Sequence, residues 1–120
     1  MMKKKINDLQ FGDIIKINFS PTKGHKQSGY RPAVVLTNPK TQAMLGGMTS
    51  VAPITSTKMG FPLHIPLDSR TTTQGVVMMD QHKMLDLNDR PFKYVERLPD
   101  ELLGRCKEMH KALYEDLLNH

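Results

Sequence analysis

The chain has 120 residues and a mass of 13.6 kDa, the size of one domain that buries a core without disulfides. Its lone cysteine excludes a disulfide-stapled secreted scaffold and favours the cytoplasm, and its apolar runs of at most four residues fall short of the roughly 20 that a membrane helix needs. The net charge is +5, and residues 1–60 hold nine basic and two acidic residues, which suits either a nucleic-acid partner or a solvated lysine-rich surface.

The first half of the chain predicts a loose basic tail followed by strands. Residues 1–10 form the expected tail, and apolar and polar side chains alternate over residues 13–19, as in a half-buried strand. A polar loop is predicted over residues 20–30. The apolar residues that follow, 33–37, predict a central strand, and residues 49–55 are another strand candidate.

The second half predicts three short strands and a helix. Strands are expected at residues 63–67, 75–79 and 92–95, and Pro66 favours a sheet edge for the first of them. The spacing then changes to that of a helix over residues 99–118, with Pro99 at its first position. Its apolar stripe consists of Leu102, Cys106, Met109, Leu113 and Leu117.

These elements predict a single domain over residues 1–120. The fold class is mainly β (α+β): a small β-barrel of five to seven short strands with the C-terminal helix packed on it. None of the five histidines pairs with another at four-residue spacing, and no glycine-rich phosphate loop occurs. We therefore expect no metal and no cofactor. His64 is expected to point outward and to be exposed, and His82 to have a structural role.

The loop at residues 20–30 concentrates basic side chains and leads directly into the buried strand. Arg31 stands where that strand starts, so its base is rigid while its guanidinium can bind a phosphate through two hydrogen bonds. His25 titrates near neutral pH and can exchange protons. The alternative, an ordinary surface loop in which Arg31 pairs with an acidic neighbour, stays open on these residues alone.

Four blocks of sequence, in order, resemble the MazF/PemK/Kid family of toxins. The first is GDII at residues 12–15, PTKGH at 21–25 and QxGxRPAVVL at 27–36. The second is PITST with GFP over residues 53–62, the third is GVV, DQ and Lys83 over residues 75–83, and the last is Leu98 and Pro99 before the helix. The resemblance covers residues 11–117.

The resemblance implies an SH3-like barrel, a homodimer, and a metal-independent endoribonuclease of a type II toxin–antitoxin system. Such enzymes cut single-stranded RNA at a short sequence and leave a 2′,3′-cyclic phosphate and a 5′-hydroxyl. The implied partner is a cognate antitoxin whose acidic tail covers the RNA groove, with DNA binding in the joint complex.

Site residues follow from the matching positions. The implied catalytic residues are Arg31 as charge stabiliser, Thr55 to orient the phosphate or the attacking hydroxyl, and His25 and Asp80 for proton transfer. The implied RNA-binding residues are Lys23, Lys26, Gln27, Ser56, Thr57, Lys58, Phe61, Arg70, Gln81 and Lys83.

Two positions depart from the family pattern. Lys26 replaces a glutamate found in many members, which leaves His25 as the titrating group of the loop. Met78 stands where one branch of the family has an arginine. No second arginine is therefore implied here, and Arg31 must stabilise the charge on the phosphate without it. Two alternatives remain open: a CcdB-like toxin of the same fold that poisons gyrase, and a catalytically silent barrel that only binds RNA or an antitoxin.

Overall fold

The computed structural model describes residues 4–18, 30–56 and 62–118, and the side chains of these residues as far as 113. Its elements in chain order are η1 (Ile6–Asp8), β1 (Asp13–Asn18), β2 (Tyr30–Val35), α1 (Pro39–Met44), β3 (Met48–Thr55), β4 (His64–Pro66), β5 (Val76–Met78), η3 (Met79–Gln81), β6 (Lys83–Asp86), β7 (Phe92–Arg97) and α2 (Asp100–Leu118).

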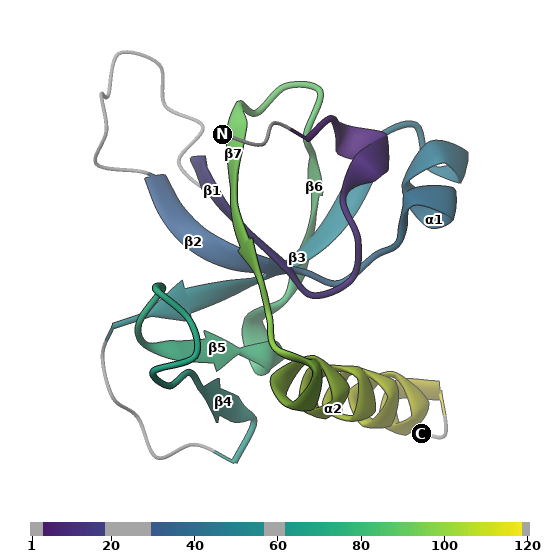
Figure 1. Ribbon diagram of the computed structural model, residues 1–120. Coiled ribbons are helices and arrows are strands. Elements are labelled where there is room, and N and C mark those ends of the chain that lie inside the picture. Colours follow the sequence, from purple (N-terminus) through teal and green to yellow (C-terminus); the bar gives the residue numbers. More distant parts are fainter. Residues whose placement is uncertain (1–3, 19–29, 57–61, 119–120) are drawn as a thin grey trace.

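The seven strands form an antiparallel sheet in the order β4-β5-β3-β2-β1-β7, with β6 paired to β3 (Figure 1). The eight-residue β3 lies against β2 along one side, and against β6 and then β5 along the other. The predicted mainly β fold with a C-terminal helix is confirmed. The pairings among the described strands make an open path from β4 to β7 rather than a closed barrel.

Each of the six predicted strands has a counterpart in the structure, with shifts at its ends. β2 begins at Tyr30, three residues before the predicted start, and β7 runs on to Arg97. β4 stands at the end of the strand order, as Pro66 predicted, because a proline cannot donate a backbone hydrogen bond to a second neighbour.

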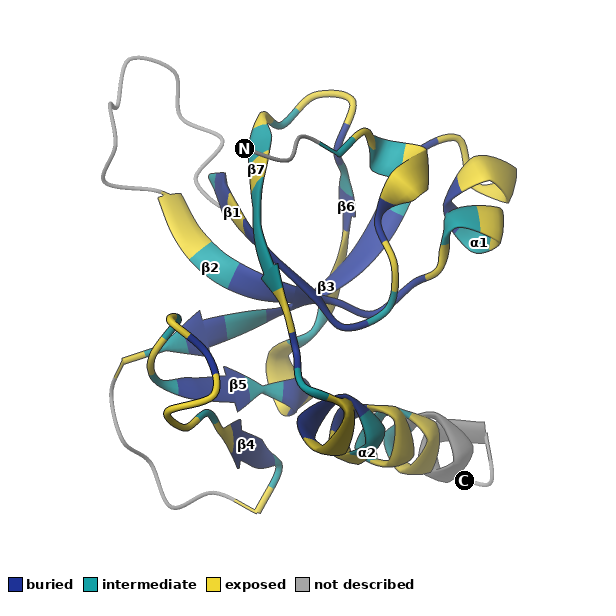
Figure 2. Ribbon diagram, in the orientation of Figure 1, coloured by how far each residue is buried: buried dark blue, intermediate teal, exposed yellow. Residues whose placement is uncertain are grey.

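Each face of the sheet buries its own core. On one face Ile14, Val34, Ile54 and Val77 pack with residues of α2. On the other face Ile15, Ile17, Ala33, Val35, Val51 and Leu85 pack with Leu9. Neighbouring positions on a strand alternate between these two cores, as the two-residue period of a strand requires. Figure 2 shows the central strands mostly buried, with the start of β2 exposed.

The C-terminal helix begins one residue later than predicted. Pro99 lies just before α2, and its carbonyl oxygen accepts a hydrogen bond from the amide of Leu103 at 2.9 Å. Cys106 is fully buried, and that burial raises the pKa of its thiol to about 11. The described members of the apolar stripe, from Leu102 to Leu113, therefore belong to the core, as their spacing predicted. In the described part of the chain, no helix is long and apolar enough to cross a membrane.

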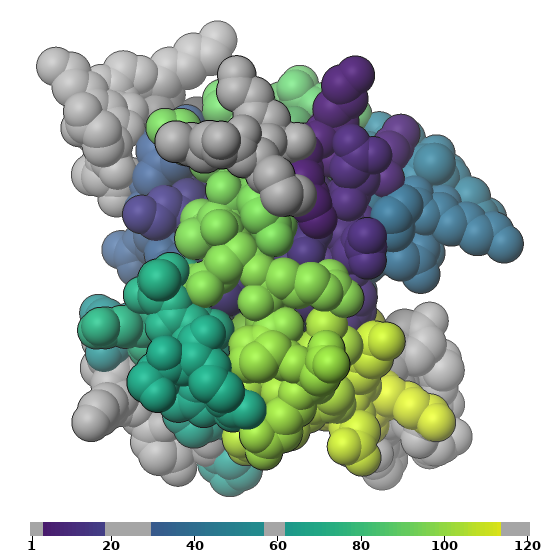
Figure 3. All heavy atoms as spheres, viewed as in Figure 1, coloured from purple at the N-terminus to yellow at the C-terminus, as the bar shows by residue number. Residues whose placement is uncertain are grey.

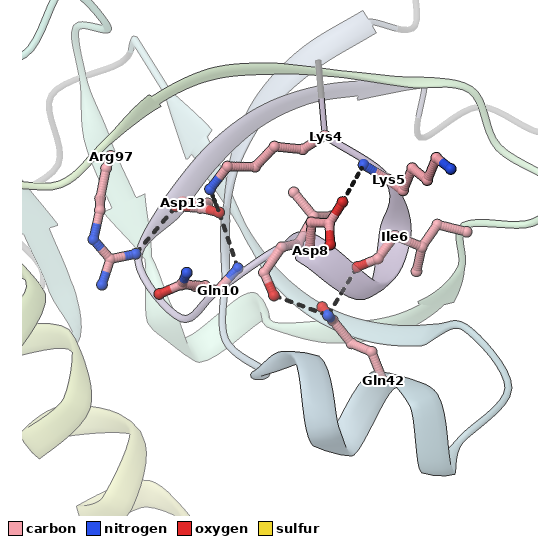
Figure 4. Close-up of polar contacts among 9 residues, drawn as sticks. Lys4, Lys5, Ile6, Asp8, Gln10, Asp13, Gln42 and Arg97 are labelled. Atoms are coloured by element: carbon pink, nitrogen blue, oxygen red, sulfur yellow. Dashed lines mark hydrogen bonds and ion pairs between the residues drawn. The ribbon is translucent and has the colours of Figure 1, made fainter. Parts of the chain in front are cut away.

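The expectation of a loose N-terminal tail is wrong for residues 4–10. Asp13 is fully buried and accepts hydrogen bonds from Lys4 Nζ at 2.9 Å and from Arg97 Nη1 at 3.1 Å (Figure 4). Leu9 is buried in the second core, and the Gln42 amide donates to its carbonyl oxygen. A buried carboxylate requires such partners, so the segment is tied to the sheet by charge as well as by packing.

Two elements were missed by the sequence analysis. α1 starts at Asn38, whose side chain accepts a hydrogen bond from the Thr41 amide at 2.9 Å, and Pro39 occupies its first turn. β6 is a four-residue strand whose Leu85 is buried. Neither sequence shows a clear apolar period, although an asparagine followed by a proline is a recognisable helix start.

Candidate active site

The sheet assigns Arg31 and Thr55, which lie 24 positions apart in the sequence, to the same face. Ala33 on β2 lies opposite Pro53 on β3. The pairing of β2 with β3 ends at Ala33 and Pro53, and Thr55 pairs with Val76 of β5. Because opposite residues of an antiparallel pair share a face, the alternation along the two strands assigns Arg31 and Thr55 to the same face. Figure 1 shows the start of β2 and the end of β3 on the same side of the molecule.

The same face continues across β5 and β4. Thr55 pairs with Val76, and Met78, two residues further along β5, pairs with His64. These residues therefore project from the face that carries Arg31. α2 packs on the opposite face. One face of the sheet therefore carries polar residues from three strands: Arg31 on β2, Thr55 on β3 and His64 on β4.

Arg31 and Thr55 differ in exposure in a way that suits a binding site. Arg31 is exposed, whereas Ala33, two residues on, is fully buried (Figure 2). The guanidinium thus extends from a backbone that the sheet holds rigid. Thr55 is half-buried beside Gly75, where a Cβ would collide with the Thr55 carbonyl oxygen.

His64 is buried, so the expectation that it is exposed is wrong. Its side chain is only 2% exposed, and its Nε2 lies 3.0 Å from Oδ1 of Asp80. The alternation on β4 assigned His64 to the correct face. It did not reveal that the side chain is buried and contacts Asp80 of η3.

Asp80 and Gln81 lie in η3, directly after β5. The Asp80 side chain is 24% exposed, so the carboxylate contacts buried His64 and still reaches solvent. Gln81 is exposed. Lys83 is also exposed and pairs in register with Val51, which assigns it to the same face as Thr55.

Arg70 belongs to a different part of the molecule. Its guanidinium binds Asp68 at 2.7 Å and Glu101 of α2 at 2.8 Å. The hydrogen bonds from Arg70 lower the pKa of Asp68 to about 2. In Figure 3 this teal segment lies against the first turns of α2. Arg70 is therefore not grouped with Arg31, and its contacts are those of a structural residue.

His82 has the structural contacts that the sequence analysis expected. Its Nδ1 lies 2.8 Å from the carbonyl oxygen of Met79, and its ring meets that of His110 on α2 edge-on, with centroids 5.6 Å apart. Burial, followed by the charge of His82, lowers the pKa of His110. These contacts fasten η3 to the helix.

The remaining candidates lie outside the described residues: Lys23, His25, Lys26 and Gln27 in the segment before β2, and Thr57, Lys58 and Phe61 in the segment after β3. In sequence, the first segment immediately precedes Arg31 and the second follows Thr55 and exposed Ser56. Across the described ranges, no three His, Cys, Asp or Glu side chains gather in a way that would hold a metal ion.

Comparisons with known proteins give consistent matches. A family model described as PemK-like, MazF-like toxin of type II toxin–antitoxin system matches residues 10–113. The chain is 37% identical over 123 residues to endoribonuclease toxin ChpB of Escherichia coli K12, covering 96% of this chain and all of that protein. It is 37% identical over 89 residues to endoribonuclease toxin MazF of the same strain, covering 71% and 73% of the two chains. A solved MazE–MazF structure from Deinococcus radiodurans has a TM-score of 0.77 at 26% identity, covering 90% of this chain and 97% of that chain.

Proposed function

Since the chain belongs to the PemK-like and MazF-like toxin family of type II toxin–antitoxin systems, we propose that the sheet face carrying Arg31 and Thr55 is its RNA-cleaving site. The protein is an endoribonuclease toxin, like its relatives ChpB and MazF. The observation that carries the proposal is the alternation along β2 and β3, which assigns an exposed arginine and a half-buried threonine to the same face, away from α2.

The proposed reaction is attack of a ribose 2′-hydroxyl on the adjacent phosphorus of single-stranded RNA. The bond from the 2′-oxygen to phosphorus forms while the bond to the 5′-oxygen breaks, which leaves a 2′,3′-cyclic phosphate and a 5′-hydroxyl. Arg31 stabilises the charge that builds up on the phosphate oxygens, because its planar guanidinium matches two of them and stays protonated. Thr55 orients the phosphate or the attacking hydroxyl.

Two proton transfers accompany this exchange of bonds. A base takes the proton of the 2′-hydroxyl, and an acid gives one to the departing 5′-oxygen. Asp80 and His25 are the proposed groups. The role of Asp80 in proton transfer is supported by its carboxylate, which is partly exposed and contacts His64 on the Thr55 face. Lys26, in place of a glutamate, supports His25 as the titrating group of its segment.

RNA binding is proposed for the exposed residues around this face, with phosphates held by lysines and bases by polar or aromatic groups. Ser56, Gln81 and Lys83 are the described members of the set. Lys23, Lys26, Gln27, Thr57, Lys58 and Phe61 complete it. Arg70 is left out, because two carboxylates already hold its guanidinium near α2.

A cognate antitoxin is the expected protein partner, because structural neighbours of this chain are solved as MazE–MazF complexes. We propose that an acidic segment of the antitoxin covers the Arg31 face and competes with RNA for its cations. We also propose that the toxin acts as a homodimer in the cytoplasm, where its RNA substrate is found.

Incubation of the purified protein with a long single-stranded RNA in excess EDTA tests the proposal, with cut ends mapped by primer extension. We expect cuts at one short recurring sequence. Arg31→Ala should slow cleavage by about 10²–10³-fold, since it removes the main donor to the developing charge. The matched control is Arg105→Ala, which removes the same charge from an exposed arginine on α2 and should cleave like the wild type.

RNA left intact by folded wild-type protein would contradict the proposal. Inhibition of gyrase supercoiling by that same inactive protein would favour the gyrase-poisoning alternative. Equal losses in the R31A and R105A variants would show that general charge matters and that the Arg31 face does not.

A further inference from the structure

The contact between His64 and Asp80 joins a buried side chain to an accessible one. His64 Nε2 lies 3.0 Å from Asp80 Oδ1, and the two side chains are 2% and 24% exposed. RNA on the Arg31 face can therefore touch Asp80 and cannot touch the ring of His64. The contact with Asp80 is a direct route by which His64 can affect cleavage.

The backbone around this pair holds it in one arrangement. The amide of Met79 donates to the carbonyl oxygen of Leu63 at 3.2 Å, so the residue before Asp80 is bonded to the residue before His64. The Met79 side chain is fully buried in the core beneath α2. η3 is thus fixed to β4 by its backbone and to the core by Met79, which leaves the Asp80 carboxylate to be oriented by its side-chain partner.

A polar side chain is unexpected at the buried position of His64. Burying an imidazole on an edge strand costs free energy unless it is hydrogen-bonded, and an aliphatic side chain fills such a slot without that cost. An ionised carboxylate only accepts hydrogen bonds, so the hydrogen of this bond sits on Nε2. His64 therefore donates to one oxygen of Asp80 and leaves the other oxygen available.

We propose that His64 is a positioning residue for RNA cleavage: it donates a hydrogen bond from Nε2 to Oδ1 of Asp80 and fixes the carboxylate in the orientation that the reaction requires. This assignment rests on the proposed function of the Arg31 face. His64 itself neither touches RNA nor transfers a proton to it.

Steady-state kinetics of His64 and Asp80 variants test the assignment, using an RNA that contains one cut site mapped for the wild type. His64→Leu fills the slot and donates nothing, so we expect kcat to fall by about 10–100-fold with KM changed less than about twofold. His64→Gln keeps an amide N–H donor and should recover most of that loss. In an Asp80→Asn background, His64→Leu should cause no further loss, because residues that act as one unit are not additive.

The outcomes separate this assignment from the function on which it rests. If the wild type leaves RNA intact, both fail. If the wild type cleaves and the H64L variant keeps its kcat, or loses as much again in the D80N background, only the assignment is overturned. A raised KM at unchanged kcat would also overturn it, because it would make His64 part of the binding surface.

A spectroscopic measurement decides the question if the Leu variant does not fold. In protein labelled with ¹⁵N-histidine, the Nε2 proton of His64 should give a resonance protected from solvent exchange. Asp80→Asn should shift that resonance, while the resonances of His82, whose ring bonds to the Met79 carbonyl oxygen, should stay in place. An unchanged His64 resonance would contradict the hydrogen bond and the proposal with it.

Discussion

Arg31 is exposed, and it stands two residues before the part of its strand that is fully buried, which starts at Ala33. The sequence predicted this, because a polar loop runs straight into an apolar strand. His64 was different. Alternation along β4 predicted an exposed side chain, but His64 is buried and contacts Asp80, which lies 16 positions later in the chain. The two-residue period of a strand assigns a side chain to one face of the sheet, but it does not show which other parts of the chain cover that face.

Arg31→Lys tests whether the shape of the cation matters as well as its charge. Lysine keeps the charge but loses the two-pronged donor, so we expect kcat to fall by about tenfold or more while KM changes little. Initial rates over a range of RNA concentrations give both constants. A lysine variant with wild-type kcat would assign Arg31 a purely electrostatic role.

Strand pairing sets the site at the level of elements. The strands themselves were predictable from alternating and apolar runs, and Pro66 marked the edge. The start of α2 was misplaced by one residue, because Pro99 suits both the first helical position and the one before it. α1 and β6 escaped prediction because their sequences, PKTQAM and KMLD, show neither a helical spacing of apolar residues nor an alternation.

Gly75 ties the geometry of β5 to that of Thr55. It has a φ of +126°, and an added Cβ would collide with the Thr55 carbonyl oxygen. Gly75→Ala should destabilise the fold by roughly 2 kcal/mol or more and lower cleavage, because β3 must shift at Thr55.

Gly104 on α2 offers the matched control, since a Cβ there has open space. Gly104→Ala should stabilise the protein by about 0.5–1 kcal/mol and leave cleavage unchanged. Thermal unfolding and RNA cleavage measure both effects. A G75A variant as stable and active as G104A would refute the link between Gly75 and Thr55.

At the scale of the whole molecule, the turn at residues 68–75 is fastened to β7 and α2 by charged hydrogen bonds. Glu96 accepts hydrogen bonds from Thr72 and Thr73, the shortest at 2.7 Å. Arg70 links Asp68 to Glu101 at the start of α2. In Figure 3 the turn lies directly against both elements. Sequence reasoning missed this network because its members come from segments about 24 residues apart or more.

These contacts predict a loss of stability in acid. Burial raises the pKa of Glu96, but the hydrogen bonds from Thr73 and Thr72 outweigh it, so the folded pKa lies below the usual 4.5. A carboxyl with a depressed folded pKa stabilises the fold above its unfolded pKa and loses that contribution as pH falls through the folded value. The pKa of Asp68, lowered from 3.8 to about 2, acts in the same direction.

Glu96→Gln should therefore destabilise the protein more at pH 7 than at pH 3. We expect roughly 1 kcal/mol at pH 7, because solvent screens a group this exposed. Chemical unfolding of both proteins at the two pH values measures the difference. A difference in unfolding free energy between the two proteins that is larger at pH 3 than at pH 7 would contradict the prediction.

The central claim is that the Arg31 face cleaves RNA by attack of the RNA's 2′-hydroxyl. One modified substrate tests this claim most directly. An RNA carrying a single 2′-deoxynucleotide on the 5′ side of the mapped cut lacks the proposed nucleophile at that bond alone. With EDTA present, the account predicts no cleavage there and unchanged cleavage of the all-ribose RNA. Cleavage at the deoxy position would mean that water or a protein group attacks the phosphorus, and would contradict the mechanism assigned to the Arg31 face.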